Sequence, residues 1–131
     1  INFQALIYPS TNIEKNYPSK DRYDGYILSN KLMSWFEEKY IDKNLLSDWR
    51  AAPMLFEDLS NLPESLIIVA GCDPLKDEGI AYGEKLKKAG NKSETIIFDG
   101  QIHGFLTMGA RIKDTKKLIN LLSDRLNKAL S

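Results

Sequence analysis

The single histidine of this chain, His103, begins a His-Gly-Phe tripeptide, and three acids, Asp73, Asp77 and Glu78, lie upstream of it. Both groups follow short apolar segments whose composition predicts β-strands. In an open α/β sheet, functional side chains gather on loops at the carboxyl ends of the strands. An imidazole beside a carboxylate is the proton-transfer pair of acyl-transfer enzymes: the carboxylate fixes the ring tautomer and the imidazole moves the proton. We therefore expect His103 and one acid to form such a pair.

Asp73 is the best candidate for the carboxylate. It comes shortly after the apolar run 66–70, and Pro74 stiffens the backbone directly behind it. Asp77 and Glu78 stand at the start of a predicted helix, where negative charges interact favourably with the helix dipole. We therefore expect Asp77 and Glu78 to act at the helix end. The predicted catalytic residues are Asp73 and His103.

Three other kinds of chemistry are compatible with residue types in this region. Cys72 has the nucleophilic atom of a thiol enzyme, but a lone cysteine at a strand end is more typical of a small buried apolar residue. Asp73 paired with Asp77 or Glu78 has the composition of a retaining glycosidase, although no aromatic sugar platform stands nearby. One histidine and scattered acids are too few ligands for a metal site. No metal and no cofactor are expected.

The third member of a serine triad is missing from the sequence. No Gly-x-Ser-x-Gly segment, which forms the nucleophile turn of α/β hydrolases, occurs in the 131 residues. The chain also opens at Ile1 without a methionine, and the next residues already have the pattern of a strand. We expect the true N-terminus to lie upstream and the chain to carry the second half of a catalytic domain.

Three strands and three helices are predicted to position these residues. Strands are expected over 3–8, 66–70 and 95–98, ended respectively by Pro9, Gly71 and the Asp-Gly pair at 99–100. Helices are expected over 29–40, 77–89 and from about 112 to 130. The organisation is a strand within 1–9, a cap-like excursion over 10–63, and a strand-helix-strand-helix unit over 64–131. This order indicates an α/β fold with parallel strands and flanking helices.

The apolar pattern of each element predicts how it packs. Residues 66–70 are uniformly apolar, as in a parallel strand that is covered on both faces. Gly79 and Gly83, four residues apart, would let the middle helix approach the sheet closely. The first and last helices each have an apolar stripe at helical spacing. The stripes comprise Leu32, Trp35, Phe36 and Tyr40 in the first helix, and Leu118, Ile119, Leu122, Leu126 and Leu130 in the last.

Composition excludes several classes of partner. Eighteen basic and eighteen acidic residues give a formal net charge of zero, which provides no field to attract nucleic acid or anionic lipid. The lysines within 85–88 and 113–117 alternate with apolar residues and are interpreted as solvated helix faces. No apolar run approaches the roughly 20 residues of a membrane span. A single cysteine mildly favours a reducing compartment, so we expect a cytoplasmic location.

An ordered series of motifs resembles the C-terminal half of hormone-sensitive-lipase-like carboxylesterases, a family of α/β hydrolases. The segment 71–79 (Gly-Cys-Asp-Pro-Leu-Lys-Asp-Glu-Gly) is similar to the family's Gly-x-Asp-Pro-Leu-x-Asp-Glu-Gly signature, and 102–105 (Ile-His-Gly-Phe) to its histidine motif. Residues 6–9 resemble the sixth strand and its exit. Residues 52–54 and 62–63, with Tyr82, Leu86 and 89–90, match further positions. The resemblance covers nearly the whole chain.

The resemblance implies the C-terminal part of an α/β-hydrolase fold with an incomplete sheet. It also implies hydrolysis of small-molecule carboxylic esters through an acyl-serine, with Asp73 as the triad acid and His103 as the base. The family's oxyanion motif and serine turn lie upstream of its sixth strand, where this chain begins. The implied partner is the N-terminal half of the domain, or a second copy joined at the exposed strand edge. A non-catalytic fragment or small-molecule-binding module, and a serine peptidase with a similar sheet, remain alternatives.

Overall fold

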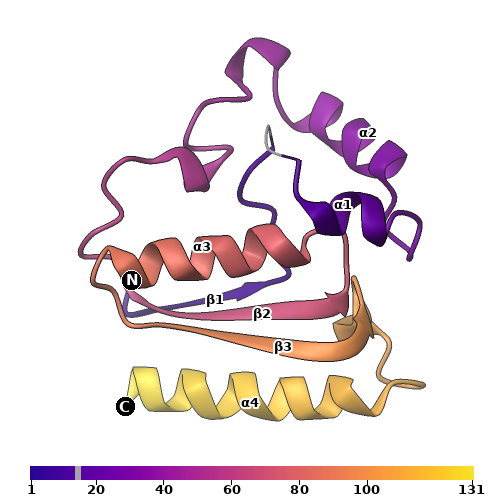
Figure 1. Ribbon diagram of the computed structural model, residues 1–131. Coiled ribbons are helices and arrows are strands. Elements are labelled where there is room, and N and C mark those ends of the chain that lie inside the picture. Colours follow the sequence, from indigo (N-terminus) through magenta and orange to yellow (C-terminus); the bar gives the residue numbers. More distant parts are fainter. Residues whose placement is uncertain (14–15) are drawn as a thin grey trace.

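The computed structural model describes residues 1–13 and 16–131. Three strands, β1 (Phe3–Ile7), β2 (Glu64–Cys72) and β3 (Ser93–Ile102), form one parallel sheet in the order β1-β2-β3. Two long helices, α3 (Lys76–Lys88) and α4 (Lys113–Leu130), follow β2 and β3. Figure 1 shows α3 on one face of the sheet and α4 on the other. The predicted α/β architecture is confirmed.

The sheet is built around β2, which is buried on both faces as its uniform apolar sequence predicted. Its side chains alternate between two cores. Ile67 and Val69 pack with Leu86 under α3, whereas Leu66 and Ile68 belong to the cluster on the α4 side. All five of these side chains are 2% exposed or less. The central strand therefore fixes the layers that position both loops at its carboxyl end.

The two glycines of α3 let that helix pack tightly against the sheet. A Cβ atom at Gly79 would lie 3.2 Å from Val69 Cγ2. At Gly83 it would lie 2.9 Å from Ile67 Cδ1 and would also collide with Thr95 Oγ1. The close approach predicted from the four-residue spacing is therefore present, and it is tightest at Gly83.

At the carboxyl edge of the sheet, β2 and β3 both extend beyond their predicted ends. β2 continues through Gly71 to Cys72, and β3 continues past the 99–100 pair to Ile102. The register shifts between the pairs Ala70↔Phe98 and Cys72↔Ile102, so one residue of β2 faces three of β3. A Cβ atom at Gly71 would stand 2.9 Å from the Asp99 Cα, so only glycine fits this irregularity. The predicted ends at Gly71 and 99–100 were wrong because a bulge lets both strands continue.

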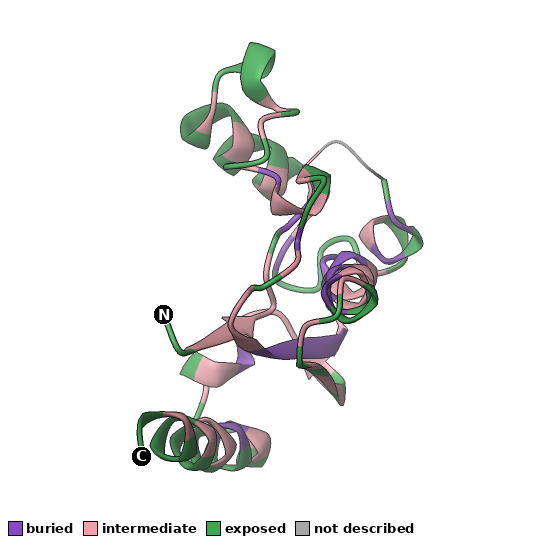
Figure 2. Cartoon of the chain, turned by 90° about the vertical axis from the view of Figure 1, so that its left-hand side faces the viewer, coloured by how far each residue is buried: buried purple, intermediate pink, exposed green. Residues whose placement is uncertain are grey.

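The excursion between β1 and β2 contains more regular structure than predicted. The helix expected over 29–40 is present as α2 (Asn30–Tyr40), with the Ser29 hydroxyl accepting a bond from the Leu32 N–H at 3.1 Å. A short helix, α1 (Pro18–Arg22), and two 3₁₀ helices, Lys43–Leu45 and Pro53–Leu55, were not predicted. Residues 14 and 15 of the excursion lie outside the described residues. Figures 1 and 2 show α2 standing away from the sheet, beyond α3.

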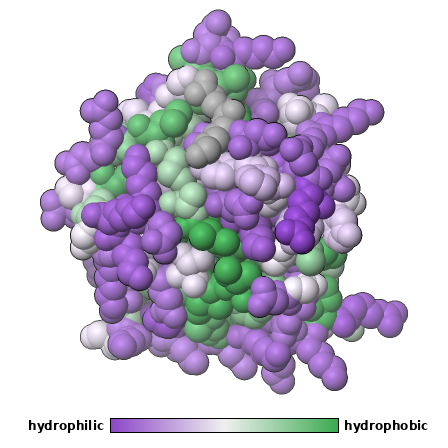
Figure 3. Space-filling model, viewed as in Figure 1, coloured by the Kyte–Doolittle hydropathy of each residue, from purple (hydrophilic) through white to green (hydrophobic). Residues whose placement is uncertain are grey.

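Two of the predicted apolar stripes are only partly buried. On α4, Leu118 is fully buried, but Ile119, Leu126 and Leu130 are 51%, 42% and 76% exposed. The buried face of α4 runs instead through Thr115 and Leu118, with Leu121 and Leu122 partly buried beside them. No residue of α2 is buried, although Trp35 and Phe36 pack edge to face with ring centroids 5.1 Å apart. Figure 3 shows apolar patches among the polar side chains on the face seen in Figure 1.

Among the described residues, no helix has the length and apolarity needed to span a membrane. Of the basic stretches, Lys87 and Lys88 of α3 are exposed, as are Lys116 and Lys117 of α4. Lys85 differs from the prediction of a solvated face. Its Nζ donates to the carbonyl oxygens of Met54 and Phe56, each at 2.7 Å, and so ties the end of the excursion to α3.

Candidate active site

The turns after β2 and β3 bring Asp73 and His103 into direct contact. His103 Nδ1 lies 2.8 Å from Asp73 Oδ2, the distance of a strong hydrogen bond. The Asp73 side chain is 1% exposed and that of His103 is 25% exposed. An ionised carboxylate only accepts, so the Nδ1 of a neutral imidazole carries the proton of this bond. The Nε2 atom then has its lone pair free to accept a proton.

The Asp73 carboxylate is aimed by its own turn. Oδ1 accepts the Leu75 N–H at 2.9 Å, while the Asp73 carbonyl accepts the Lys76 N–H at 3.0 Å. This is the local side-chain-to-backbone bonding that aspartate favours in turns. It leaves Oδ2 for the imidazole. The buried carboxylate thus has two hydrogen-bond donors in fixed directions.

The histidine turn is held from below by α4. Gly104 has a φ of +77°, a left-handed conformation that glycine adopts without strain and that begins the 3₁₀ helix Phe105–Thr107. Phe105 is fully buried in the α4-side core, and its carbonyl accepts the hydroxyl of buried Thr115 at 2.7 Å. These contacts fix the backbone on the carboxyl side of His103.

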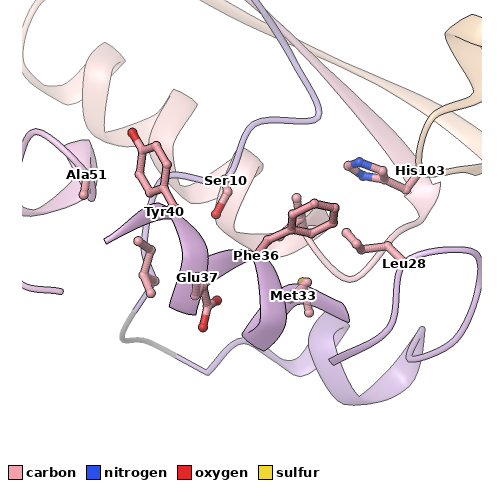
Figure 4. A pocket seen from close by; sticks show the side chains of 10 residues that line it. Ser10, Leu28, Met33, Phe36, Glu37, Tyr40, Ala51 and His103 are labelled. Carbon is pink, nitrogen blue, oxygen red and sulfur yellow. The ribbon is translucent and has the colours of Figure 1, made fainter. Parts of the chain in front are cut away.

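A cavity of about 380 Å³ opens beside His103, between the sheet edge and the excursion. This is within the range of small-molecule sites, about 300–1,000 Å³. Its walls are mostly apolar. They comprise Ser10, Ile13, Leu28, Met33, Phe36, Glu37, Tyr40, Ala51, Leu75 and His103. Figure 4 shows His103 at one end of this cavity, with Tyr40 and Ala51 toward the other.

Asp77 and Glu78 stand in the first turn of α3, as predicted, but their oxygen atoms bond to the excursion. Asp77 Oδ2 accepts the Ser19 N–H at 2.9 Å. Glu78 Oε1 accepts the N–H groups of Thr11 and Asn12 at 2.7 and 3.3 Å. Both acids thus stand at the predicted helix end and have, in addition, hydrogen bonds that the sequence did not predict. Their hydrogen bonds attach the excursion to the helix that follows Asp73.

The environment of Glu78 is unusual for a carboxylate. The side chain is fully buried, and burial raises the pKa of its carboxyl group above the ordinary value. The bond from the Thr11 N–H and the charge of Lys20, whose Nζ lies 3.7 Å from Oε2, act in the opposite direction. Glu78 is therefore a buried structural acid at the base of the excursion.

The competing site chemistries gain no geometric support. Neither Asp77 nor Glu78 is among the described residues that line the cavity beside His103, so no carboxylate pair faces it. Cys72 is half-buried at the end of β2. The described residues contain no group of three or more His, Cys, Asp or Glu side chains arranged to hold a metal ion.

Comparison with known proteins identifies the family. Residues 1–107 match the sequence model of the alpha/beta hydrolase fold. The chain belongs to this family. It is 33% identical over 130 residues to the ethyl acetate hydrolase of Pseudomonas putida, a match that covers 97% of the chain and 41% of that enzyme. It is also 33% identical over 132 residues to the carboxylic ester hydrolase LipN of Mycobacterium tuberculosis, covering 95% of the chain and 35% of LipN.

Solved α/β-hydrolase structures agree with this assignment. The esterase of the archaeon Pyrobaculum calidifontis superimposes with a TM-score of 0.90 at 34% identity, covering 95% of this α/β-hydrolase chain and 41% of the esterase. The metagenomic carboxylesterase EstE1 gives a TM-score of 0.95 at 29% identity, covering all of the chain and 46% of EstE1. The chain thus spans about two fifths of the length of these relatives. The predicted resemblance to carboxylesterases is confirmed.

Some residues of the site in this α/β hydrolase were not singled out from the sequence. Tyr8, at the end of β1, packs its ring against the His103 ring, and Leu28 and Met33 line the cavity. A tyrosine directly before a proline at a strand end is a signal of a turn but not of a site. Leu28 and Met33 carry no chemical signal, because apolar cavity walls look like core in a sequence.

Proposed function

We propose that this chain supplies the acid, Asp73, and the base, His103, of a serine carboxylesterase whose nucleophile lies outside these 131 residues. The observation that carries the proposal is the 2.8 Å bond between Asp73 Oδ2 and His103 Nδ1, made at the edge of an apolar cavity. The family supports it, since the relatives named above are carboxylic ester hydrolases. A pure binding module has no need for a buried carboxylate paired with an imidazole.

The reaction follows from the roles of the two ring nitrogens. His103 Nε2 takes the proton of a serine hydroxyl while the serine oxygen forms a bond to the ester carbonyl carbon. The resulting imidazolium then gives this proton to the alkoxide oxygen as the carbon–oxygen ester bond breaks and the alcohol leaves. In the second half, Nε2 takes a proton from water, which attacks the acyl-serine, and returns that proton to the serine oxygen. Asp73 stays ionised throughout and holds the Nδ1–H tautomer.

The cavity indicates the class of substrate. Leu28, Met33 and Phe36 offer apolar contact to an acyl or alcohol group, and a volume of about 380 Å³ suits a small ester. The Glu37 carboxylate among its lining residues disfavours anionic substrates by repulsion. We therefore propose small uncharged carboxylic esters as substrates.

The test uses the protein encoded by the complete reading frame that contains these residues. Hydrolysis of p-nitrophenyl acetate and butyrate is measured for the wild type and for His103→Ala, and a fluorophosphonate probe reports an activated serine. The expected result is probe labelling and turnover in the wild type, both lost in His103→Ala with the fold retained. Turnover that survives His103→Ala, or a frame without a serine the probe can label, would overturn the proposal.

A further inference from the structure

Tyr8, the residue that follows β1, has a strained backbone directly beneath the histidine turn. Its φ is +37°, a region that residues with a Cβ atom rarely enter. It keeps this conformation while its N–H makes a bond to the Ile68 carbonyl at 2.7 Å, and Pro9 follows it. Strain of this kind persists only where surrounding contacts impose it, and it is concentrated at functional sites.

The side chain of Tyr8 reaches three consecutive parts of the histidine turn. Its ring centroid lies 4.8 Å from that of His103, at an interplanar angle of 55°, and 5.9 Å from that of Phe105. Its hydroxyl oxygen accepts the Leu106 N–H at 3.3 Å. Asp73 holds the imidazole at Nδ1, and Thr115 holds the turn through Phe105. Tyr8 is the described residue that supports the ring of His103 by an aromatic contact.

From this arrangement we infer that Tyr8 is the positioning residue for the base, holding the His103 ring in the plane in which Nδ1 meets Asp73 and Nε2 faces the cavity. The catalytic part of this inference rests on the proposed function, whereas the contact between the Tyr8 and His103 rings is independent of it. Burial raises the pKa of the Tyr8 hydroxyl, so this group remains protonated at neutral pH. Its role is steric and electrostatic, because an aromatic face favours a partial positive charge on the imidazole edge.

The chain offers a direct readout, because it contains one histidine. The Nδ1 proton and the ring C–H resonances of His103 are unique in an NMR spectrum and need no assignment by elimination. Exchange of the Nδ1 proton with water reports how well the Asp73–His103 bond is held. The ¹⁵N shifts of the ring report the tautomer. Neither measurement needs a serine or a substrate.

Two substitutions separate the ring from the hydroxyl. Tyr8→Phe keeps the ring and removes the bond from Leu106, and Tyr8→Leu removes both. Tyr82 provides the matched control, because it is a buried tyrosine that belongs to the other core cluster, with Leu59, Ile67, Val69 and Leu86. Tyr82→Phe and Tyr82→Leu reproduce the same chemical changes away from His103. Tyr8→Met, whose flexible side chain fills a similar space, replaces Tyr8→Leu if that variant does not fold.

We expect Tyr8→Leu to accelerate exchange of the His103 Nδ1 proton by roughly two- to tenfold, the range given by the energy of an aromatic pair. Tyr8→Phe should change this exchange rate by less than about twofold. The Tyr82 variants should lower the unfolding temperature but leave the exchange rate of the His103 Nδ1 proton unchanged. In the full reading-frame protein, Tyr8→Leu should lower kcat with KM unchanged. Exchange and ¹⁵N shifts unaltered in Tyr8→Leu, or altered equally in Tyr82→Leu, would overturn the inference. Because the NMR result requires no activity, it stands apart from a failure of the esterase assay.

Discussion

Replacing Asp73 with asparagine tests the proposed site at the atom that matters most. Asparagine has the same shape, but one of its two terminal atoms is an NH₂ group that only donates. The oxygen keeps the bond from the Leu75 N–H if it stays in the position of Oδ1, which places the NH₂ group opposite His103 Nδ1. Nδ1 must then accept, and the imidazole proton moves to Nε2. The nitrogen that is not bonded to residue 73 is thereby blocked as a base.

The expected sizes of the two effects are very different. Both hydrogen bonds of residue 73 persist in the asparagine variant, and only the one to His103 reverses its direction, so the free energy of unfolding should fall by only about 1 kcal/mol, the net value of one altered bond. The loss of the orienting carboxylate should lower kcat by about 10⁴, as in the serine protease triad. Asp73→Ala, in contrast, leaves the Leu75 N–H without its side-chain acceptor and should cost more stability, about 1–3 kcal/mol.

The measurement combines kinetics with a spectroscopic check. The kcat of the reading-frame protein is compared for Asp73→Asn and Asp77→Asn, and the ¹⁵N shifts of His103 in the 131-residue chain give the tautomer. Asp77→Asn is the matched control, because Asp77 bonds to Ser19 and not to the imidazole. It should change kcat by less than about tenfold, since its local charge effects are worth about 0.3–1 kcal/mol. Equal losses in both variants would show that Asp73 is the wrong acid.

Three further outcomes are expected. If the nucleophile and the oxyanion donors, worth roughly 3–4 kcal/mol each, lie outside the 131 residues as proposed, this chain alone should not hydrolyse p-nitrophenyl acetate above background; organophosphate-sensitive turnover would contradict this. β1 pairs only with β2 among the described residues, so sedimentation should show self-association through Phe3–Ile7 at micromolar concentration, not a stable monomer. Burial raises the pKa of the Glu78 carboxyl in the folded state above 4.5. The protonated carboxyl therefore contributes fully to the free energy of unfolding at a pH below the pKa of the unfolded state, and this contribution is lost as the pH rises through the pKa of the folded state. In urea unfolding, Glu78→Gln should therefore gain stability relative to the wild type as the pH rises above the pKa of the unfolded state, and a difference that does not change with pH would refute this.

The parts of the fold that the sequence predicted are those set by local pattern. The uniformly apolar run in β2 gave a central parallel strand, Ser29 gave the start of α2, and the spacing of Gly79 and Gly83 gave the packing of α3. In each case neighbouring residues carry the physical cause, so the pattern is readable without the tertiary structure. The predicted strand ends at Gly71 and 99–100 were wrong, because a glycine is equally compatible with the end of a strand and with a bulge inside it.

The parts that could not be predicted depend on contacts between distant segments. The α1 helix has five residues and begins at Pro18, and Ser19 is bonded to Asp77 and to Pro74 of the α3 turn. Such a short helix has little stability of its own, so its existence reflects these tertiary contacts. The exposure of Ile119 and Leu126 on α4 has a similar reason: an apolar stripe shows which side can be buried but not how wide the neighbouring surface is.

Asp73 and Glu78 show most clearly where sequence reasoning ends. Both are fully buried carboxylates on one turn and the following helix, and both accept backbone N–H groups. What separates them is the remaining partner: Asp73 meets an imidazole at the edge of a cavity, whereas Glu78 faces Lys20 at the base of the excursion. Residues 73–78 thus carry the proposed acid at one end and, through Glu78, hold Thr11 and Asn12 of the excursion at the other. The first turn of α3 therefore connects the excursion to the Asp73–His103 pair.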